Sequence, residues 1–205
     1  MKQNSVKWLG CLLSFAFLII SCTGTELTHK HVNEAYKGKP VSNILVIAIT
    51  GNEDSRRSFE RKFVAQLKAA GVEAISSEEA IPMPPDLELK KEAIISAVKH
   101  FKNDAVIITH LIGREEKVTL TRSDDYYGFY HSRYKGSYTH DPGYSRTSKT
   151  VRLETNLYDS KTEQLIWSGQ SKTISKDSKD QIINDVIKVL VHDLQNNKLI
   201  PPKRM

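Results

Sequence analysis

Thiols are the scarcest reactive groups in this chain of 205 residues, and their positions limit the chemistry they can do. There are two, Cys11 and Cys22. Cys11 lies within the apolar run Leu9–Ile20, which follows the positively charged Lys2 and Lys7. This run of 12 residues is too short to span about 30 Å of hydrocarbon, and it has the length of the apolar core of a secretory signal peptide. Removal of that segment would leave Cys22 as the sole thiol.

Cys22 ends the sequence Ile19-Ile20-Ser21-Cys22, in which a small residue precedes the thiol. This sequence resembles the lipobox of bacterial lipoproteins. The resemblance implies that the sulfur of Cys22 is alkylated with diacylglycerol, that the signal peptide 1–21 is removed, and that the new amine receives a fatty acid such as palmitate. The alternative is an ordinary secretory signal with a cysteine near its cleavage site. An exported domain without a disulfide is readily explained if its one remaining thiol carries lipid.

Acidic residues and histidines in segment 122–149 are the other groups that could do chemistry. The candidates are Asp124, Asp125, His131, His140 and Asp141. A metal-assisted hydrolase could use His131, His140 and Asp141, but the spacing matches neither HExxH nor a paired Cys/His set. The sequence contains no GxSxG motif, and no thiol remains for a Cys–His pair. We therefore expect no enzyme, no metal and no cofactor other than the covalent lipid on Cys22.

The composition of segment 122–149 differs from that of the rest of the chain. Its 28 residues hold six of the eight tyrosines. Tyrosine combines an apolar ring with a polar tip, which suits a partner surface or a membrane interface. The alternative is a long hairpin that packs its tyrosines on the edge of a sheet. We predict a partner-binding insertion with the aromatic residues Tyr126, Tyr127, Phe129, Tyr130, Tyr134, Tyr138 and Tyr144.

Hydrophobic patterns predict one α/β domain over 41–205. The apolar run Asn43–Thr50 is typical of a buried central strand. A helix follows, with its apolar residues at helical spacing, and Val72–Ile75 is a second short strand. Strand, helix and strand in this order predict a βαβ unit with parallel strands. The turn Thr50-Gly51-Asn52 lies where such sheets bind ligands, but it lacks a phosphate-binding motif, and Glu53 and Asp54 would repel a phosphate.

The second half of the chain predicts an antiparallel extension of the sheet. A helix ends near Phe101, and residues 104–112 form a third strand. We expect a turn at residues 113–115 that leads into a fourth strand at 117–121. Residues 150–158 and 164–170 form a hairpin, and a helix from Ser178 to about Asn196 ends the domain. The fold class is therefore α/β (α+β), with a mixed parallel and antiparallel sheet flanked by about three helices.

The hairpin carries the sequence Leu157-Tyr158-Asp159, Lys161-Thr162 and Leu165-Ile166-Trp167-Ser168-Gly169. With the first strand and the last helix, this motif resembles a group of small bacterial envelope lipoproteins of unknown function. That resemblance implies a fold similar to the N-terminal domain of TolB and to the periplasmic domain of the lipoprotein CsgG. It supplies no catalytic residue, and Leu165 and Trp167 are expected in the core.

Residues 22–40 are polar and show neither a helical nor a strand period, so we expect a lipidated tether. Loss of Lys2 and Lys7 with the signal peptide lowers the net charge from +6 to +4, and no basic stripe with interleaved aromatic residues indicates nucleic-acid binding. The sequence thus predicts a non-catalytic lipoprotein, anchored to a membrane, that binds another envelope protein. A homo-oligomeric assembly or secretion-complex subunit is the alternative. Thr23 after Cys22 resembles the signal for the outer membrane, facing the periplasm.

Overall fold

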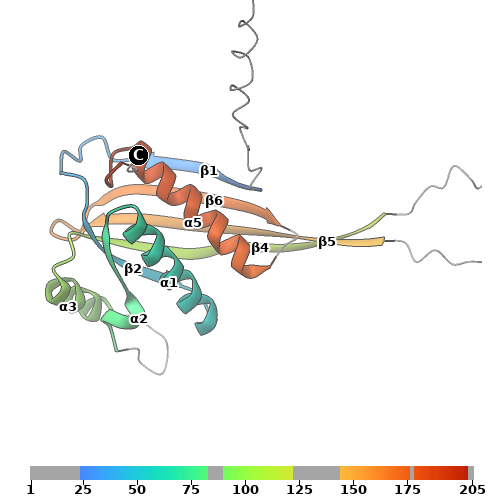
Figure 1. The fold of residues 1–205 in the computed structure, drawn as a ribbon, viewed down its shortest axis with the longest axis horizontal. Coiled ribbons are helices and arrows are strands. Elements are labelled where there is room, and N and C mark those ends of the chain that lie inside the picture. Colours follow the sequence, from blue (N-terminus) through green and yellow to red (C-terminus); the bar gives the residue numbers. More distant parts are fainter. Residues whose placement is uncertain (1–23, 83–89, 122–143, 176–177, 203–205) are drawn as a thin grey trace, which may run out of the picture.

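The computed structural model describes residues 24–82, 90–121, 144–175 and 178–202, which form a six-stranded mixed sheet with helices on both faces (Figure 1). In the sheet order β1-β6-β5-β4-β2-β3, β2 is parallel to β3 and β4, whereas β4, β5, β6 and β1 are antiparallel neighbours. The predicted mixed α/β fold is therefore confirmed. The strands are β1 (Thr25–Val32), β2 (Asn43–Ile49), β3 (Glu73–Ser76), β4 (Ala105–Thr121), β5 (Tyr144–Asp159) and β6 (Leu165–Ser175).

The helices of the described chain cover the two faces of the sheet unequally. They are α1 (Glu53–Ala69), α2 (Ser77–Ala80), α3 (Lys91–Phe101) and α5 (Lys179–Asn196). α1 and α5 pack on one face over the main core, and α3 packs on the other face over a smaller cluster (Figure 1). Along β2, Ile44 and Val46 point into the main core, while Leu45 and Ile47 point toward α3. Burial on both faces explains why this strand is apolar without alternation.

Polar side chains begin three of these helices. Asn52, Ser76 and Ser178 are the N-caps of α1, α2 and α5, and each side chain accepts a backbone N–H from the first turn. Such caps satisfy amide groups that have no partner within the helix. Gly71, with φ of 82°, takes the left-handed conformation that follows α1. The predicted βαβ unit is confirmed as β2, α1 and β3.

The stretch predicted as part of an irregular tether contains an edge strand. The prediction for 22–40 is wrong over Thr25–Val32, which pairs with β6 as β1. Leu27 and Val32 both pack against the main core, although five positions separate them. A register slip between Leu27 and His29 brings them to the same face, and this bulge destroys the alternating pattern that identifies a strand. The domain therefore starts at β1 instead of residue 41.

A second difference concerns the predicted turn at residues 113–115. β4 is a single strand of 17 residues, and residues 117–121 are its last part rather than a separate strand. The register slips between Leu111 and Gly113, so Ile112 is an extra residue that forms a bulge. A bulge bends a strand without ending its pairing, and β4 stays paired with β5 to its end. Residues 144–149, which we predicted to belong to the insertion, form the start of β5.

The β5–β6 hairpin motif is structural, but the prediction that Leu165 lies in the core is wrong. Leu165 is half-buried, and Ile166, the extra residue where the register with β5 slips, is fully buried in the core instead. Trp167 is fully buried, and its Nε1 donates a hydrogen bond of 3.0 Å to Oδ2 of Asp193 on α5. Gly169 leaves room for the indole, because a Cβ at this position would collide with the ring. Asp159 Oδ1 accepts the backbone N–H groups of the two turn residues Lys161 and Thr162. The motif therefore stabilises the turn of the hairpin and links the hairpin to α5 by a hydrogen bond.

A buried carboxylate fixes α1 against the carboxyl end of β2. Glu60 is completely buried, and its Oε1 accepts the N–H of Ala48 at 2.9 Å and the hydroxyl of Ser77 at 2.7 Å. The Arg56 guanidinium lies 3.4 Å from the same carboxylate and donates to the Ser77 hydroxyl at 2.9 Å. A buried charge needs such partners to offset its lost hydration. This network sets the position of α1 at the end of the sheet described next.

Candidate functional site

The features with functional potential meet at one end of the sheet, which we call the ribbon end. Thr25, Thr173, Val151 and Arg114 are register partners across four adjacent strands, so β1 begins level with the second half of β4. The N-termini of α1 and α5 lie at the same end, and β4 and β5 extend beyond it to the right (Figure 1). The start of the described chain, two helix N-termini and the longest strands therefore share one region.

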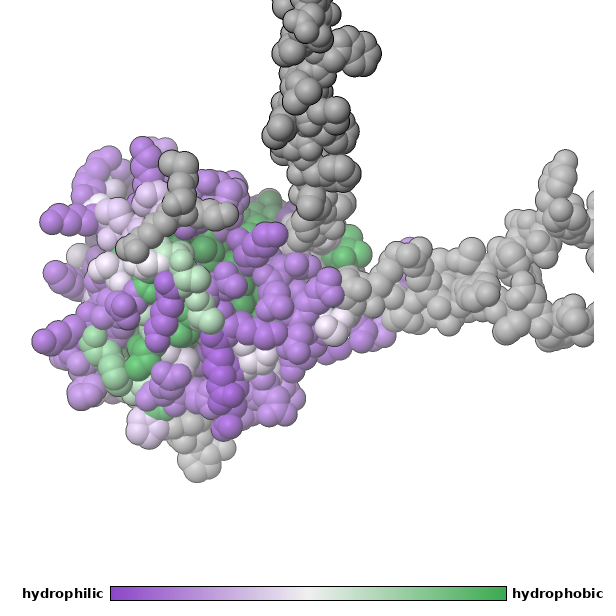
Figure 2. Space-filling model, viewed as in Figure 1, coloured by the Kyte–Doolittle hydropathy of each residue, from purple (hydrophilic) through white to green (hydrophobic). Residues whose placement is uncertain are grey.

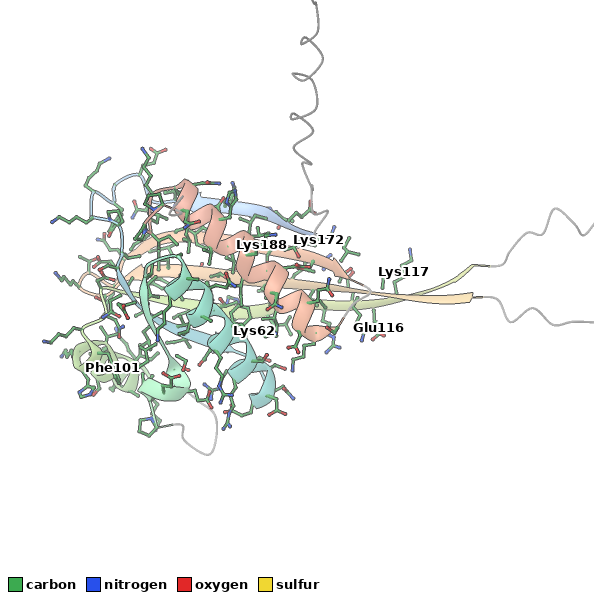
Figure 3. The ribbon with its side chains drawn as sticks, in the orientation of Figure 1. Lys62, Phe101, Glu116, Lys117, Lys172 and Lys188 are labelled. Carbon is green, nitrogen blue, oxygen red and sulfur yellow. The ribbon has the colours of Figure 1, made fainter. Side chains whose placement is uncertain are left out.

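The two longest strands leave the sheet as a two-stranded ribbon. β2 pairs with β4 only as far as His110, and β6 pairs with β5 only from Lys149 onward. Residues 117–121 and 144–148 therefore pair only with one another among the described strands. Lys117 marks the base of this ribbon in Figure 3. A two-stranded ribbon is at best marginally stable in water, so a partner surface would stabilise it.

Exposed hydrophobic side chains gather at the ribbon end. Hydrophobic surface is visible where the ribbon leaves the body in Figure 2. Four large hydrophobic residues are exposed in the described chain, and all of them lie on the last parts of β2 and β6 or around the β4 bulge. They are Ile49 (56% exposed), Leu111 (45%), Ile112 (42%) and Ile174 (50%). Their concentration at one end, while the other large hydrophobic side chains of the described residues are buried or partly buried, indicates a contact surface.

A pocket of about 250 Å³ opens at the ribbon end between α1, α5 and the sheet. We call it the α1–α5 pocket. Its buried side chains form the floor, and its exposed side chains form the rim. The floor includes Phe59, Ile182 and Ile183, flanked by the half-buried Val151 and Leu153. The pocket thus has an apolar interior built from two helices and one strand.

Basic residues surround this apolar interior. Arg114, Lys149 and Lys179 line the pocket, and no acidic residue is among the described side chains that line it. Asn52 and Ser55 from the first turn of α1 add polar groups. Within the described part of the chain, none of the three cations has a carboxylate within 4.0 Å. The rim therefore presents positive charge that is available to an anion.

Two of the acidic residues at the starts of α1 and α5, Glu53 and Asp180, are bound to cations outside the pocket lining. Glu53 forms ion pairs of 2.6 Å with Arg56 and 2.7 Å with Arg57, and hydrogen bonds from these two arginines lower the pKa of Glu53 to about 2. Asp180 lies 2.8 Å from Lys62, and the hydrogen bond from Lys62 holds the pKa of Asp180 below its usual value. Of the two acids expected to repel a phosphate at this turn, Glu53 is therefore compensated by arginines, whereas Asp54 forms no ion pair among the described residues.

Most of the predicted site residues lie outside the described residues. This holds for Cys22 and for Tyr126, Tyr127, Phe129, Tyr130, Tyr134 and Tyr138. Tyr144 is the first residue of β5, in the ribbon, where its backbone pairs with Thr121. The candidate metal ligands Asp124, Asp125, His131, His140 and Asp141 also fall outside the described chain. Among the residues that are described, no group of three His, Cys, Asp or Glu side chains could hold a metal ion.

The α1–α5 pocket is the part of the site that sequence reasoning missed. The turn at Thr50-Gly51-Asn52 is a signal for it, since this turn ends β2 and starts α1. The basic residues come from β4, β5 and α5, far apart in sequence, and they meet only through strand register. No local spacing in the sequence could therefore have predicted that these three basic residues lie together.

In the described chain, no helix is both long and apolar enough to cross a membrane.

Comparison with known proteins gives structural similarity alone. No protein family model matches the chain, and no curated protein matches it. The PelC dodecamer from Paraburkholderia phytofirmans has a similar structure with a TM-score of 0.51 and 12% sequence identity, over 88% of this chain and 99% of that one. Lipoprotein GNA1162 from Neisseria meningitidis gives a TM-score of 0.42 at 17% identity, over 76% of this chain and 99% of that one.

The PelC similarity extends over nearly the whole of both chains. At 12% identity it shows a shared fold and does not carry over an activity. The fold observed here, a mixed sheet with helices on both faces, is thus one that a dodecameric protein also adopts.

Proposed function

We propose that this chain is a non-catalytic lipoprotein of the bacterial envelope, anchored by lipid on Cys22, which binds another envelope component through the β4–β5 ribbon and the tyrosine-rich segment at its tip. One observation carries the proposal: β1 enters the sheet at Thr25, three residues after Cys22, at the ribbon end. Three residues reach about 10 Å when extended. A lipid on Cys22 would therefore hold the ribbon end next to the membrane.

The ribbon supplies edges to which a partner strand can bind. β4 has no neighbour on its β2 side after His110 among the described strands, and residues 144–148 of β5 have none on their β6 side. Such edges present unpaired N–H and C=O groups that can extend a sheet with a strand from another protein. Charged residues along β4, including Glu116 and Lys117, oppose nonspecific pairing (Figure 3). The ribbon therefore suits a partner with a matching strand.

The location that we propose is the outer membrane, with the domain in the periplasm. Support comes from Thr23, which follows Cys22 without an acidic residue, and from the resemblance of the hairpin motif to small envelope lipoproteins. A relationship to the TolB N-terminal domain and to CsgG belongs to the same proposal. The covalent lipid on Cys22 is the only group resembling a cofactor that the proposed function includes.

A ribbon-shortened variant tests the proposed function. Joining Val118 to Thr147 through Asn-Gly, in place of residues 119–146, keeps the register of the remaining pairs and supplies a two-residue hairpin turn. Crosslinking and purification from native membranes should recover an envelope component with the full chain and lose it with the variant. The Cys22→Ala form is the control for anchoring, because it should leave the membrane fraction. Equal recovery with the shortened ribbon contradicts the proposal.

Self-assembly is a second candidate function, and the similarity to a dodecameric protein favours it. The free ribbon edges and the edge strand β1 could each pair with a second copy. Light scattering on the chain without its signal peptide would measure the oligomeric state. A strict monomer at high concentration excludes self-assembly, whereas a defined oligomer that survives ribbon shortening excludes the ribbon as its interface.

A further inference from the structure

The α1–α5 pocket combines an apolar floor with a basic rim. Phe59, Ile182 and Ile183 on the floor are each less than 10% exposed, and they face a cavity of about 250 Å³. Arg114 and Lys179 on the rim are exposed, and Lys149 is half-buried. An apolar interior with a few polar groups at its mouth is the usual construction of a small-molecule site. The ligand that fits it has an anionic head and an apolar body.

The charge of the rim indicates which kind of head group the ligand carries. The three basic residues of the rim face no acidic side chain among the described residues that line the pocket. Of the acids in the first turns of α1 and α5, Glu53 and Asp180 are held by Arg56, Arg57 and Lys62. Asp54 is not among the residues that line the pocket. An uncharged head, such as the diacylglyceryl group that would be attached to Cys22, leaves the rim without counter-charge. A phosphate head would instead bind to the lysine and arginine side chains.

The location of the pocket indicates which kind of apolar group the ligand carries. Ile49 and Leu111 line the pocket and are about half exposed, so apolar surface continues from its interior to its mouth. Val151 in the pocket is separated from Thr25 only by Thr173, a span of two strand spacings or about 10 Å. Because Thr25 is three residues from Cys22, an anchored domain would place the pocket mouth near the lipid headgroups. A cavity of this size holds part of one acyl chain, and the rest remains in the bilayer.

We propose that the α1–α5 pocket binds an anionic phospholipid of the membrane that carries the domain, with the phosphate at Arg114, Lys149 and Lys179 and one acyl chain on the floor formed by Phe59, Ile182 and Ile183. The proposal rests on the anchoring described under the proposed function. It adds a non-covalent lipid ligand that would hold the ribbon end in a fixed orientation on the membrane.

Native mass spectrometry of the mature, lipidated protein tests this proposal. The protein is purified in a neutral detergent and supplied with equal amounts of phosphatidylglycerol and phosphatidylcholine. We expect one phosphatidylglycerol to be retained, at least tenfold in preference to phosphatidylcholine. Glycerol phosphate as a third probe separates binding of the head alone from binding of the lipid, and retention of the soluble probe as strongly as the lipid overturns the role of the floor.

Charge-reversed variants identify the site. Lys179→Glu combined with Arg114→Glu should reduce retention of phosphatidylglycerol at least tenfold. Both side chains are exposed, and glutamate in the first turn of α5 is favourable, so the variant should fold. Lys188→Glu, a single charge reversal at an exposed residue farther along α5, is the control for charge on this helix and should retain the lipid (Figure 3). Equal retention of both lipids, or equal losses in the two variants, overturns the proposal.

The same spectra separate this inference from the anchoring on which it rests. The covalent lipid on Cys22 appears as added mass on the denatured protein, whereas the bound phospholipid is lost on denaturation. Added covalent mass without a retained phospholipid contradicts the pocket assignment alone. Absence of the covalent mass contradicts the anchoring.

Discussion

The backbone N–H of Ile174 donates a hydrogen bond of 2.8 Å to the carbonyl oxygen of Gly24. This bond continues the pairing of β1 with β6 to a point two residues after Cys22. It also places Ile174, which is half exposed, beside the segment that would lead to the lipid. The link between anchor and domain is therefore far shorter than the tether that composition predicts for 22–40. An anchored domain with so short a link lies against its membrane.

Limited digestion with trypsin distinguishes a paired β1 from a tether. Lys30 lies within β1, whereas Lys37 lies in the segment between β1 and β2. Cleavage needs local opening of the chain, and opening at Lys30 must break its pairing with Gly169 on β6. We expect cleavage after Lys37 to precede cleavage after Lys30 by at least tenfold in rate. Similar rates at the two sites would show that β1 is not held in the sheet.

Asp193 joins α5 to two strands, and its loss should destabilise the domain. Its carboxylate accepts hydrogen bonds from Trp167 Nε1 and Lys30 Nζ, both at 3.0 Å. Asp193→Ala leaves the buried indole N–H without an acceptor, and we expect a loss of about 2–3 kcal/mol in the free energy of unfolding. Lys30→Ala removes only a half-exposed ion pair and should cost less than about 1 kcal/mol. Urea denaturation measures both, and equal losses would refute the role of the indole bond.

Among the polar residues near the carboxyl end of β2, truncation of Glu60 should cause the largest loss in the free energy of unfolding. Glu60→Ala leaves Ala48 N–H and Ser77 Oγ without their acceptor and Arg56 without one of its two carboxylate partners. Removal of one partner of a buried pair typically costs about 3–5 kcal/mol. Arg61→Ala breaks an exposed ion pair with Glu78 and should change stability by less than about 1 kcal/mol. Thermal unfolding followed by circular dichroism compares the two variants.

Acid should lower the free energy of unfolding of the domain, in part because Glu53 becomes protonated. Its folded-state pKa of about 2 lies below the ordinary value of 4.5, because Arg56 and Arg57 stabilise the carboxylate. The stabilisation is therefore complete above about pH 4.5 and is lost as the pH falls toward 2. Since Glu53 is partly exposed, we expect a contribution of about 1 kcal/mol after allowing for solvent screening.

The variant Glu53→Gln isolates this contribution. It should be less stable than the unmodified chain at pH 7, and the difference should shrink as the pH falls from about 4.5 to 2. Denaturant titrations at several pH values measure the difference. A constant difference across this range would exclude ionisation of Glu53 as its cause.

Local patterns predicted the parts of this fold whose side chains follow a simple period. The βαβ unit, the β5–β6 hairpin and α5 could be recognised, because helical and strand periods persist along each element. β1 escaped recognition because a bulge shifts its pattern and its outward side chains are polar. Residues 113–115 contain turn-forming residue types, yet pairing with β5 extends β4 through them. Tertiary pairing outweighed local preference in both strands.

The candidate site, like the fold, was predicted only where a local sequence pattern marks it. The turn at residues 50–52 marked the end of the sheet at which the pocket lies. Of the two acids expected to repel a phosphate, Glu53 is compensated by Arg56 and Arg57, which follow it at helical spacing. Lys149 and Lys179 join the pocket through strand register and helix packing, which no local motif records. The role of Cys22 remains a prediction from its sequence motif.

The proposed function requires the ribbon end to bind an envelope component while lipid on Cys22 holds it at the membrane. The most direct test is crosslinking in native membranes with the full chain and with the variant in which Asn-Gly replaces residues 119–146. We expect both proteins to fractionate with the membrane and only the full chain to crosslink to the component. Crosslinking of the same component by the shortened variant, at the level of the full chain, would contradict it.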